Sequence, residues 1–210
     1  MDADSVVASV ARGKTFYDGN TVDTADYGGI HIEGSIRRFK DYDYVADTTM
    51  LKLRSAAMNT CVLVRNVSGI NLLPGRAARW QAAMRGRRVD GYTTTLAAEA
   101  AGIVDEWLPP AGVPNGDLFW LLIDGNTLLR TDLAGDTGTD FSEGDILIAA
   151  TAATSQATTA GRLRQADFDT AITGLLLGNQ IANRIGRAMS ANTTAQTNRQ
   201  LLAQVSINRV

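Results

Sequence analysis

The sequence has one cysteine and one histidine, and these two shortages exclude several kinds of site. Cys61 has no second cysteine with which to form a disulfide within the chain, and any metal site would lack the usual pair of thiolates. His31 cannot form a two-histidine metal site, and no nucleophile has an obviously placed histidine base. We therefore expect Cys61 to be a small core residue and His31 to be a structural or surface residue.

Long apolar runs and an excess of charge of one sign are also missing. No run approaches the length needed to span a bilayer, and residues 1–4 lack the positive start and apolar centre of a signal peptide. The net charge is −2, with acidic and basic residues interspersed, so nothing indicates a surface for nucleic acid. The sequence predicts a soluble protein that binds neither membrane nor nucleic acid and has other proteins as partners.

The common catalytic and phosphate-binding motifs are absent. None of GxGxxG, GxxxxGK[ST] and GxSxG occurs in the chain. Asp105 and Glu106 are adjacent on an expected strand and so face opposite ways, which excludes a shared glycosidase site. The carboxylates of residues 132–145 could gather around a calcium ion, but the acidic spacing of an EF-hand is missing and a plain acidic turn is the preferred interpretation. We expect no enzyme, no cofactor and no metal.

Turn and strand signals make up much of the remaining sequence. The turn over residues 114–117 has a proline that fixes φ and an Asn-Gly pair that tolerates positive φ. It precedes a short apolar run over residues 118–123, which predicts a strand buried on both faces, with Phe119 and Trp120 on opposite sides. Either both rings belong to the core of the chain, or one packs against a neighbouring layer or subunit.

Up to residue 151, similar strand signals recur at intervals of roughly ten residues without intervening helices, which predicts a β-barrel or sandwich. The expected strands cover residues 61–67, 77–84, 89–95, 101–108, 118–124, 127–133, 145–151, 181–191 and 199–209. We expect a tight hairpin at residues 124–126 and one short helix at residues 168–176, while residues 181–191 also fit a helix. The predicted fold class is mainly β: a compact antiparallel barrel or sandwich of short strands, with one short helix and a long N-terminal extended arm.

The composition changes over residues 14–49, where no helical or alternating period persists. Aromatic residues in a segment without a core of its own are anchors that need another surface. We therefore divide the chain into an extended, partner-binding arm, residues 1–60, and a β-rich domain, residues 61–210. The alternative, that the arm wraps its own domain, is compatible with this. The residues expected to contact a partner protein or a neighbouring copy are Phe16, Tyr17, Tyr27, Arg37, Arg38, Phe39, Tyr42 and Tyr44.

Four groups of residues together resemble a known family. They are Val64-Arg65-Asn66-Val67-Ser68-Gly69 with Leu73-Pro74, Gly102-Ile103-Val104-Asp105-Glu106 with Leu108-Pro109, Val113-Pro114-Asn115-Gly116-Asp117-Leu118-Phe119-Trp120, and Ile185-Gly186-Arg187-Ala188. Over residues 60–210 the chain resembles the capsid decoration, or cement, proteins of tailed bacteriophages. It differs from their smallest members by its greater length, its arm and its helix.

The resemblance implies a β-rich barrel with a structural role. Such a protein assembles as a homotrimer on the outer face of the icosahedral head, bound to the major capsid protein across capsomer junctions of the expanded shell. It would be made in the host cytoplasm and would end on the outer surface of the virion. The alternative is a β-sandwich glycan-binding or fibre-associated module of a virion, in which an exposed Trp80 or Trp107 stacks on a sugar.

Overall fold

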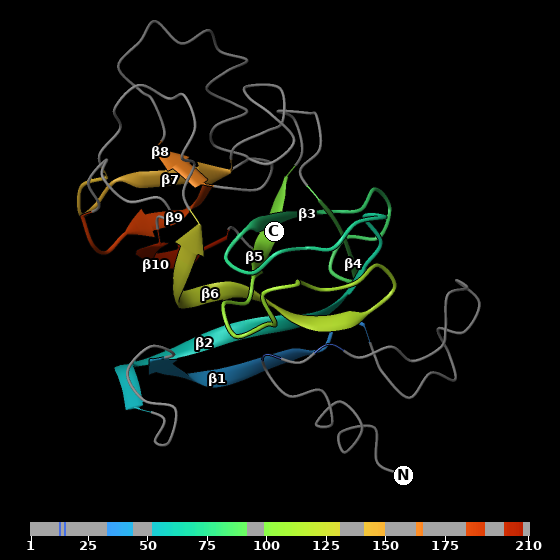
Figure 1. The fold of residues 1–210 in the computed structure, drawn as a ribbon, viewed down its shortest axis with the longest axis horizontal. Coiled ribbons are helices and arrows are strands. Elements are labelled where there is room, and N and C mark those ends of the chain that lie inside the picture. Colours follow the sequence, from blue (N-terminus) through green and yellow to red (C-terminus); the bar gives the residue numbers. More distant parts are fainter. Residues whose placement is uncertain are drawn as a thin grey trace, which may run out of the picture.

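A computed structural model describes residues 13, 15, 33–43, 52–91, 99–130, 141–149, 163–165, 184–191 and 200–207 (Figure 1). Within these residues the fold is mainly β, as predicted, and no helix long and apolar enough to cross a membrane is found. The strands are β1 (Ile36–Asp43), β2 (Lys52–Asn66), β3 (Ala77–Trp80), β4 (Arg88–Gly91), β5 (Ala100–Val104), β6 (Leu118–Arg130), β7 (Ile146–Ala149), β8 (Leu163–Gln165), β9 (Arg184–Ala188) and β10 (Gln200–Ser206). The predicted helix and His31 lie outside the described residues.

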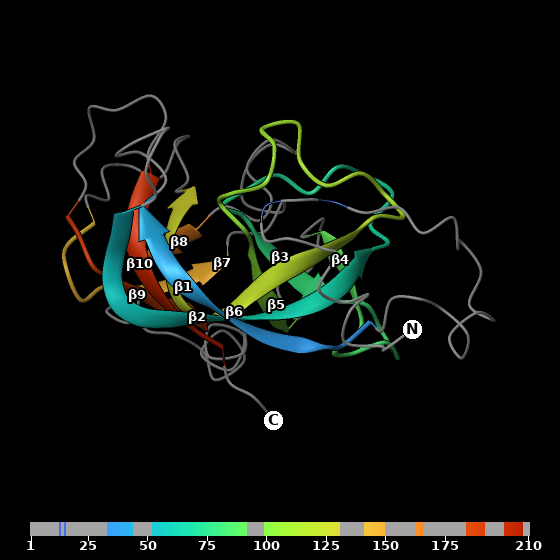
Figure 2. The same cartoon turned by 90° about the horizontal axis from the view of Figure 1, so that it is seen from below.

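All ten strands belong to one sheet, in the order β1-β2-β4-β3-β5-β6-β10-β9-β7-β8. An additional pairing of β2 with β6 joins β2, β4, β3, β5 and β6 into a ring. In Figure 2 this ring lies on one side and β7 to β10 on the other, while β2 and β6 extend across both parts. The β2–β4 pair is parallel, so the sheet is mixed. The sequence had predicted an antiparallel arrangement, and this pair corrects that prediction.

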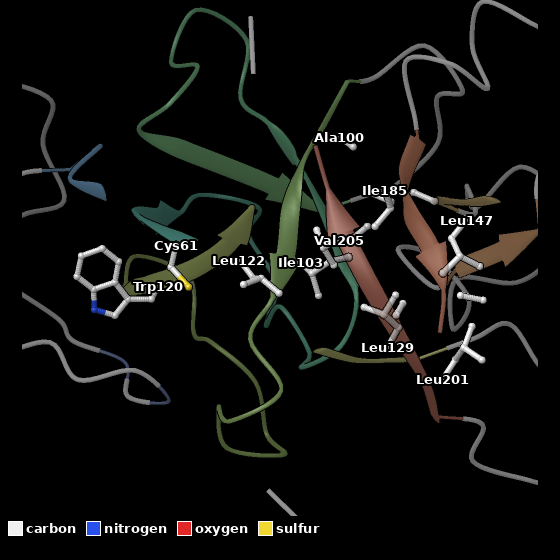
Figure 3. Packing of buried hydrophobic residues seen from close by; sticks show 14 of the residues in the cluster. Cys61, Ala100, Ile103, Trp120, Leu122, Leu129, Leu147, Ile185, Leu201 and Val205 are labelled. Atoms are coloured by element: carbon white, nitrogen blue, oxygen red, sulfur yellow. The ribbon is translucent and has the colours of Figure 1, made fainter. Parts of the chain in front are cut away.

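Side chains of β6 alternate between two apolar clusters, because successive residues of a strand face opposite sides. Trp120 and Leu122 belong to the first cluster, and Phe119 and Leu121 belong to the second. The predicted strand buried on both faces is therefore confirmed. Figure 3 shows the first cluster extending from Trp120 to Leu147 of β7.

The first cluster lies against β7, β9 and β10, and it consists of Cys61, Leu63, Ala77, Ala100, Ile103, Leu118, Trp120, Leu122, Leu129, Phe141, Leu147, Ala149, Ile185, Ala188, Leu201, Ala203 and Val205. The second cluster takes residues from every strand of the ring and from two loops, and it consists of Val62, Val64, Leu72, Ala78, Val89, Ala101, Val104, Leu108, Val113, Phe119, Leu121 and Ile123. Cys61 is a fully buried core residue, as expected.

The tight hairpin predicted at residues 124–126 is wrong, because β6 continues through it to Arg130. Before this point β6 pairs with β2, and after it β6 pairs with β10. The buried Asn59 side chain bridges the change: its Oδ1 accepts a hydrogen bond from Asn126 N and its Nδ2 donates to Asn126 O, both at 2.9 Å. Gly125, with φ of 124°, leaves room for this amide.

The predicted boundary between arm and domain, after residue 60, falls inside β2. Residues 36–43, also assigned to the arm, form β1 and pair with β2 in an antiparallel arrangement. These two parts of the arm are thus strands of the sheet, which corrects the division of the chain at this point. Phe16, Tyr17, Tyr27 and Tyr44 lie outside the described residues.

We predict that Gly125→Ala destabilises the protein by about 3 kcal/mol or more, since it combines an unfavourable positive φ with overpacking. The added Cβ would overlap the Asn59 amide oxygen and lie 2.8 Å from Asn59 Cα. Gly86→Ala is the matched control, because Gly86 has φ of 83° but no atom within 4 Å of the added Cβ. Urea unfolding of both variants measures the difference. Equal losses would mean that the Asn59 contact does not restrict residue 125.

Candidate partner-binding surface

The two-stranded ribbon of β1 and the first part of β2, residues 36–43 and 52–62, presents apolar and basic side chains outward. On β1, Ile36, Arg38 and Lys40 are exposed, while the residues between them are at least half-buried. Met58 lies opposite Lys40 and is 44% exposed, and Leu53 is 55% exposed. Ile36, at 57%, completes a group of three among the five large apolar side chains that are exposed in the described residues. We call this part of the structure the β1–β2 ribbon.

The ribbon packs on the domain through two aromatic pairs. Phe39 meets Trp120 edge to face, with ring centroids 5.5 Å apart, and is packed against the first cluster. Tyr42 meets Trp107 in the same way at 6.5 Å. Among the predicted partner-binding residues, Phe39 and Tyr42 therefore make contacts within the chain, as in the alternative in which the arm wraps its own domain. Arg38 remains exposed, and Arg37 is half-buried.

A bulge of several residues in β2 interrupts the ribbon and brings polar side chains together beside β1. Lys40 lies opposite Met58 and Tyr42 opposite Leu53, so a single residue of β1, Asp41, faces residues 54–57 of β2. Bulges of this kind bend a strand and redirect its side chains. Here the bulge places Arg54 and Ser55 beside Asp41, whose side chain is completely buried.

Arg54 connects three segments of the chain at this bulge. Its Nη2 donates to Glu106 Oε1 at 2.8 Å and to the carbonyl oxygen of Tyr42 at 3.1 Å. Its Nη1 is 3.7 Å from Asp41 Oδ1, and Thr127 Oγ1 donates to Glu106 Oε1 at 3.3 Å. The side chain of Arg54 is only 10% exposed and that of Glu106 only 5%. Since an unpaired charge is costly in such an environment, the ion pairs hold the ribbon against the β5–β6 loop.

Neutral groups complete this buried polar network. Asp41 Oδ2 accepts hydrogen bonds from Ser55 Oγ at 2.8 Å and from Asn126 Nδ2 at 3.1 Å. Asn126 in turn is bound through its backbone to Asn59. Asn59, whose side chain occupies the point where β6 separates from β2, is thus linked through Asn126 to Asp41 of β1. The network lies beneath the ribbon and connects β1 and β2 to β6.

The residues that sequence reasoning considered for other roles have structural partners. Trp80 is half-buried and packs against the second cluster, and Trp107 is half-buried beside Tyr42, so neither indole is an exposed platform for a sugar. Asp105 Oδ1 accepts a hydrogen bond from Trp107 N at 3.3 Å, whereas Glu106 binds Arg54. Within the described residues, no three potential metal ligands lie together.

Sequence reasoning missed Arg54, Ser55, Asn59 and Asn126. Their hydrogen-bond partners are distant in sequence, as Asn59 and Asn126 are, with a sequence separation of 67. A bulge of several residues has no short sequence signature, so the polar stretch before Cys61 did not suggest a strand.

No protein-family model matches the chain, and no curated protein matches its sequence.

We predict that Arg54→Met destabilises the protein by about 3–5 kcal/mol, because it removes the guanidinium that pairs with the buried carboxylates of Asp41 and Glu106. Arg85→Met is the control. Arg85 pairs with Glu99 at the surface, with 47% and 39% of the side chains exposed, and such a pair contributes about 0–1 kcal/mol. Chemical denaturation at neutral pH compares the two variants. If Arg54→Met is as stable as Arg85→Met, the network does not fasten the ribbon.

Proposed function

We propose that this protein is a structural component of a tailed-bacteriophage virion that binds the outer surface of the icosahedral head. In this role it stabilises the shell across capsomer junctions, as a homotrimer bound to the major capsid protein. It is made in the host cytoplasm and acts on the virion surface. The resemblance of four sequence segments to decoration proteins suggests this function, and the mainly β fold is compatible with it. The proposal assigns no catalytic role.

The observation that carries the proposal is the β1–β2 ribbon. Ile36, Leu53 and Met58 supply exposed apolar area, and Arg38 and Lys40 supply positive charge next to it. Burial of apolar surface is the main favourable contribution in most protein–protein association, and basic side chains beside it favour an acidic partner surface. The ribbon therefore fits a patch on the shell that combines exposed apolar and acidic side chains.

Contacts beneath the ribbon hold it in one conformation, and for this reason a small contact area can be sufficient for binding to the shell. The buried network and the Phe39–Trp120 contact hold β1 in place before any partner arrives. A preorganised surface loses little conformational freedom on binding, so more of the interaction energy appears as affinity. Three copies in one assembly would bind the shell at the same time, which raises the net hold far above that of a single contact.

We predict that Arg38→Glu weakens binding to mature heads that lack the protein by about tenfold or more at low salt, since it places like charges together at the interface. The difference from the wild type should shrink at high salt, because exposed charges are screened. Cosedimentation with heads at several protein concentrations measures the affinity.

Arg85→Glu changes charge by the same amount on the turn after β3 and should bind as the wild type does. Equal binding by Arg38→Glu would exclude the ribbon as the attachment surface. A wild-type protein that does not bind the heads at all would refute the proposed function itself.

A further inference from the structure

Two of the stretches of the chain that lack charged residues and histidine, each ten residues long, also contain its prolines. They are residues 66–75, with sequence NVSGINLLPG, and residues 107–116, with sequence WLPPAGVPNG. All four prolines of the chain lie in them, although 20% of the residues of the whole chain are charged.

The structure joins these stretches into one unit, which we call the neutral tip. Leu72 and Val113 exchange two backbone hydrogen bonds, at 3.0 and 2.9 Å. The Asn66 side chain donates from Nδ2 to the carbonyl oxygens of Ile70 and Val113, both at 2.8 Å. Gly69 N donates to Asn115 Oδ1 at 2.8 Å, which ties the far end of one loop to the other. The two loops are thus locked together from several sides.

Most exposed residues of the tip are apolar, and its two exposed asparagines, Asn71 and Asn115, form hydrogen bonds across the two loops. Its other polar atoms are largely used in contacts within and between the loops, and its prolines restrict the backbone further. Ile70 is 52% exposed. Pro109, Pro110, Ala111 and Pro114 are exposed as well. A preorganised group of apolar side chains of this kind binds a partner at small entropic cost.

We propose that the neutral tip binds an uncharged, apolar patch of the shell protein, as a second contact besides the β1–β2 ribbon; this inference rests on the proposed function. The tip has no charge with which to compensate a charged group that becomes buried against it, so a charged patch is disfavoured. The ribbon, with Arg38 and Lys40, favours an acidic patch instead. Two surfaces that differ in chemistry bind two different patches, which is what a protein that bridges parts of a shell requires.

The test is binding to mature heads that lack the protein, measured at low and high salt for Ile70→Glu and Ile70→Leu. Ile70→Glu should bind about tenfold or more weakly, because the new carboxylate must be buried without a partner. Unlike the loss in Arg38→Glu, this loss should persist at high salt, where exposed charges are screened. Ile70→Leu should retain wild-type affinity. Met189→Glu is the matched control, since Met189 is 41% exposed and lies outside the tip.

The outcomes separate this inference from the proposed function. If the wild type binds heads and Ile70→Glu binds equally well, the tip is not a contact, although the function stands. If Ile70→Glu instead changes the oligomeric state in light scattering and spares binding to heads, the tip faces another copy and the shell is the wrong occupant. A wild type that does not bind heads refutes both proposals. Matching unfolding curves for the Ile70→Glu, Ile70→Leu, Met189→Glu and Arg38→Glu variants would establish that no loss of binding comes from misfolding.

Discussion

The pairing of β2 with β6 is the contact on which the rest of the structure depends. Residues 61–64 of β2 and 118–123 of β6 are buried, and in each strand alternate side chains belong to two separate apolar clusters. Every fully buried large apolar side chain contributes about 1.5–3 kcal/mol to the stability of the folded state. A strand with both faces buried supplies such side chains to the clusters on either side of it. The same pairing joins five strands into a ring and leaves the far end of β6 free to pair with β10.

The segments that resemble decoration proteins are mostly parts of this framework. Asn66 binds the loop before Leu72 and the carbonyl oxygen of Val113, and Arg65 donates from Nη1 to the carbonyl oxygen of Gly116 at 2.7 Å. At Gly186, a Cβ would overlap the carbonyl oxygen of Gln204 on the neighbouring strand. These residues serve the fold, so their resemblance bears on architecture more directly than on attachment. The surfaces proposed to attach the protein, the ribbon and the neutral tip, have to be argued from exposure and charge.

Sequence reasoning succeeded where one local signal decides the structure. The apolar run of residues 118–123 after a proline turn is too short for a core helix and was predicted as a buried strand, and strands were also predicted where β7, β9 and β10 lie, although the segment of β9 fitted a helix as well. It failed where a distant residue replaces a local partner. Asp-Gly-Asn at residues 124–126 has the composition of a tight turn, but the Asn59 side chain satisfies the backbone there and lets the strand continue.

The candidate surface was only partly predictable for a related reason. The aromatic and basic residues of β1 marked a segment that needs a surface, which is true of Phe39 and Tyr42 toward their own domain. Which side chains face outward depends on the pleat and on the bulge at Asp41, and both are set by pairing with β2. Once this register is known, Arg38 remains available to a partner and Phe39 does not.

The position of β10 between β6 and β9 has a consequence for how the chain is assembled during translation. The strands of the ring all precede residue 131, so the ribosome releases them before the others and they can pair early. The first cluster instead needs Leu201, Ala203 and Val205, which are synthesised after every other described strand. Until then, the far half of β6 has an unpaired edge, and contacts of such long sequence separation form slowly. The nascent protein therefore passes through a stage in which one half is closed and the other is exposed to aggregation or to chaperones.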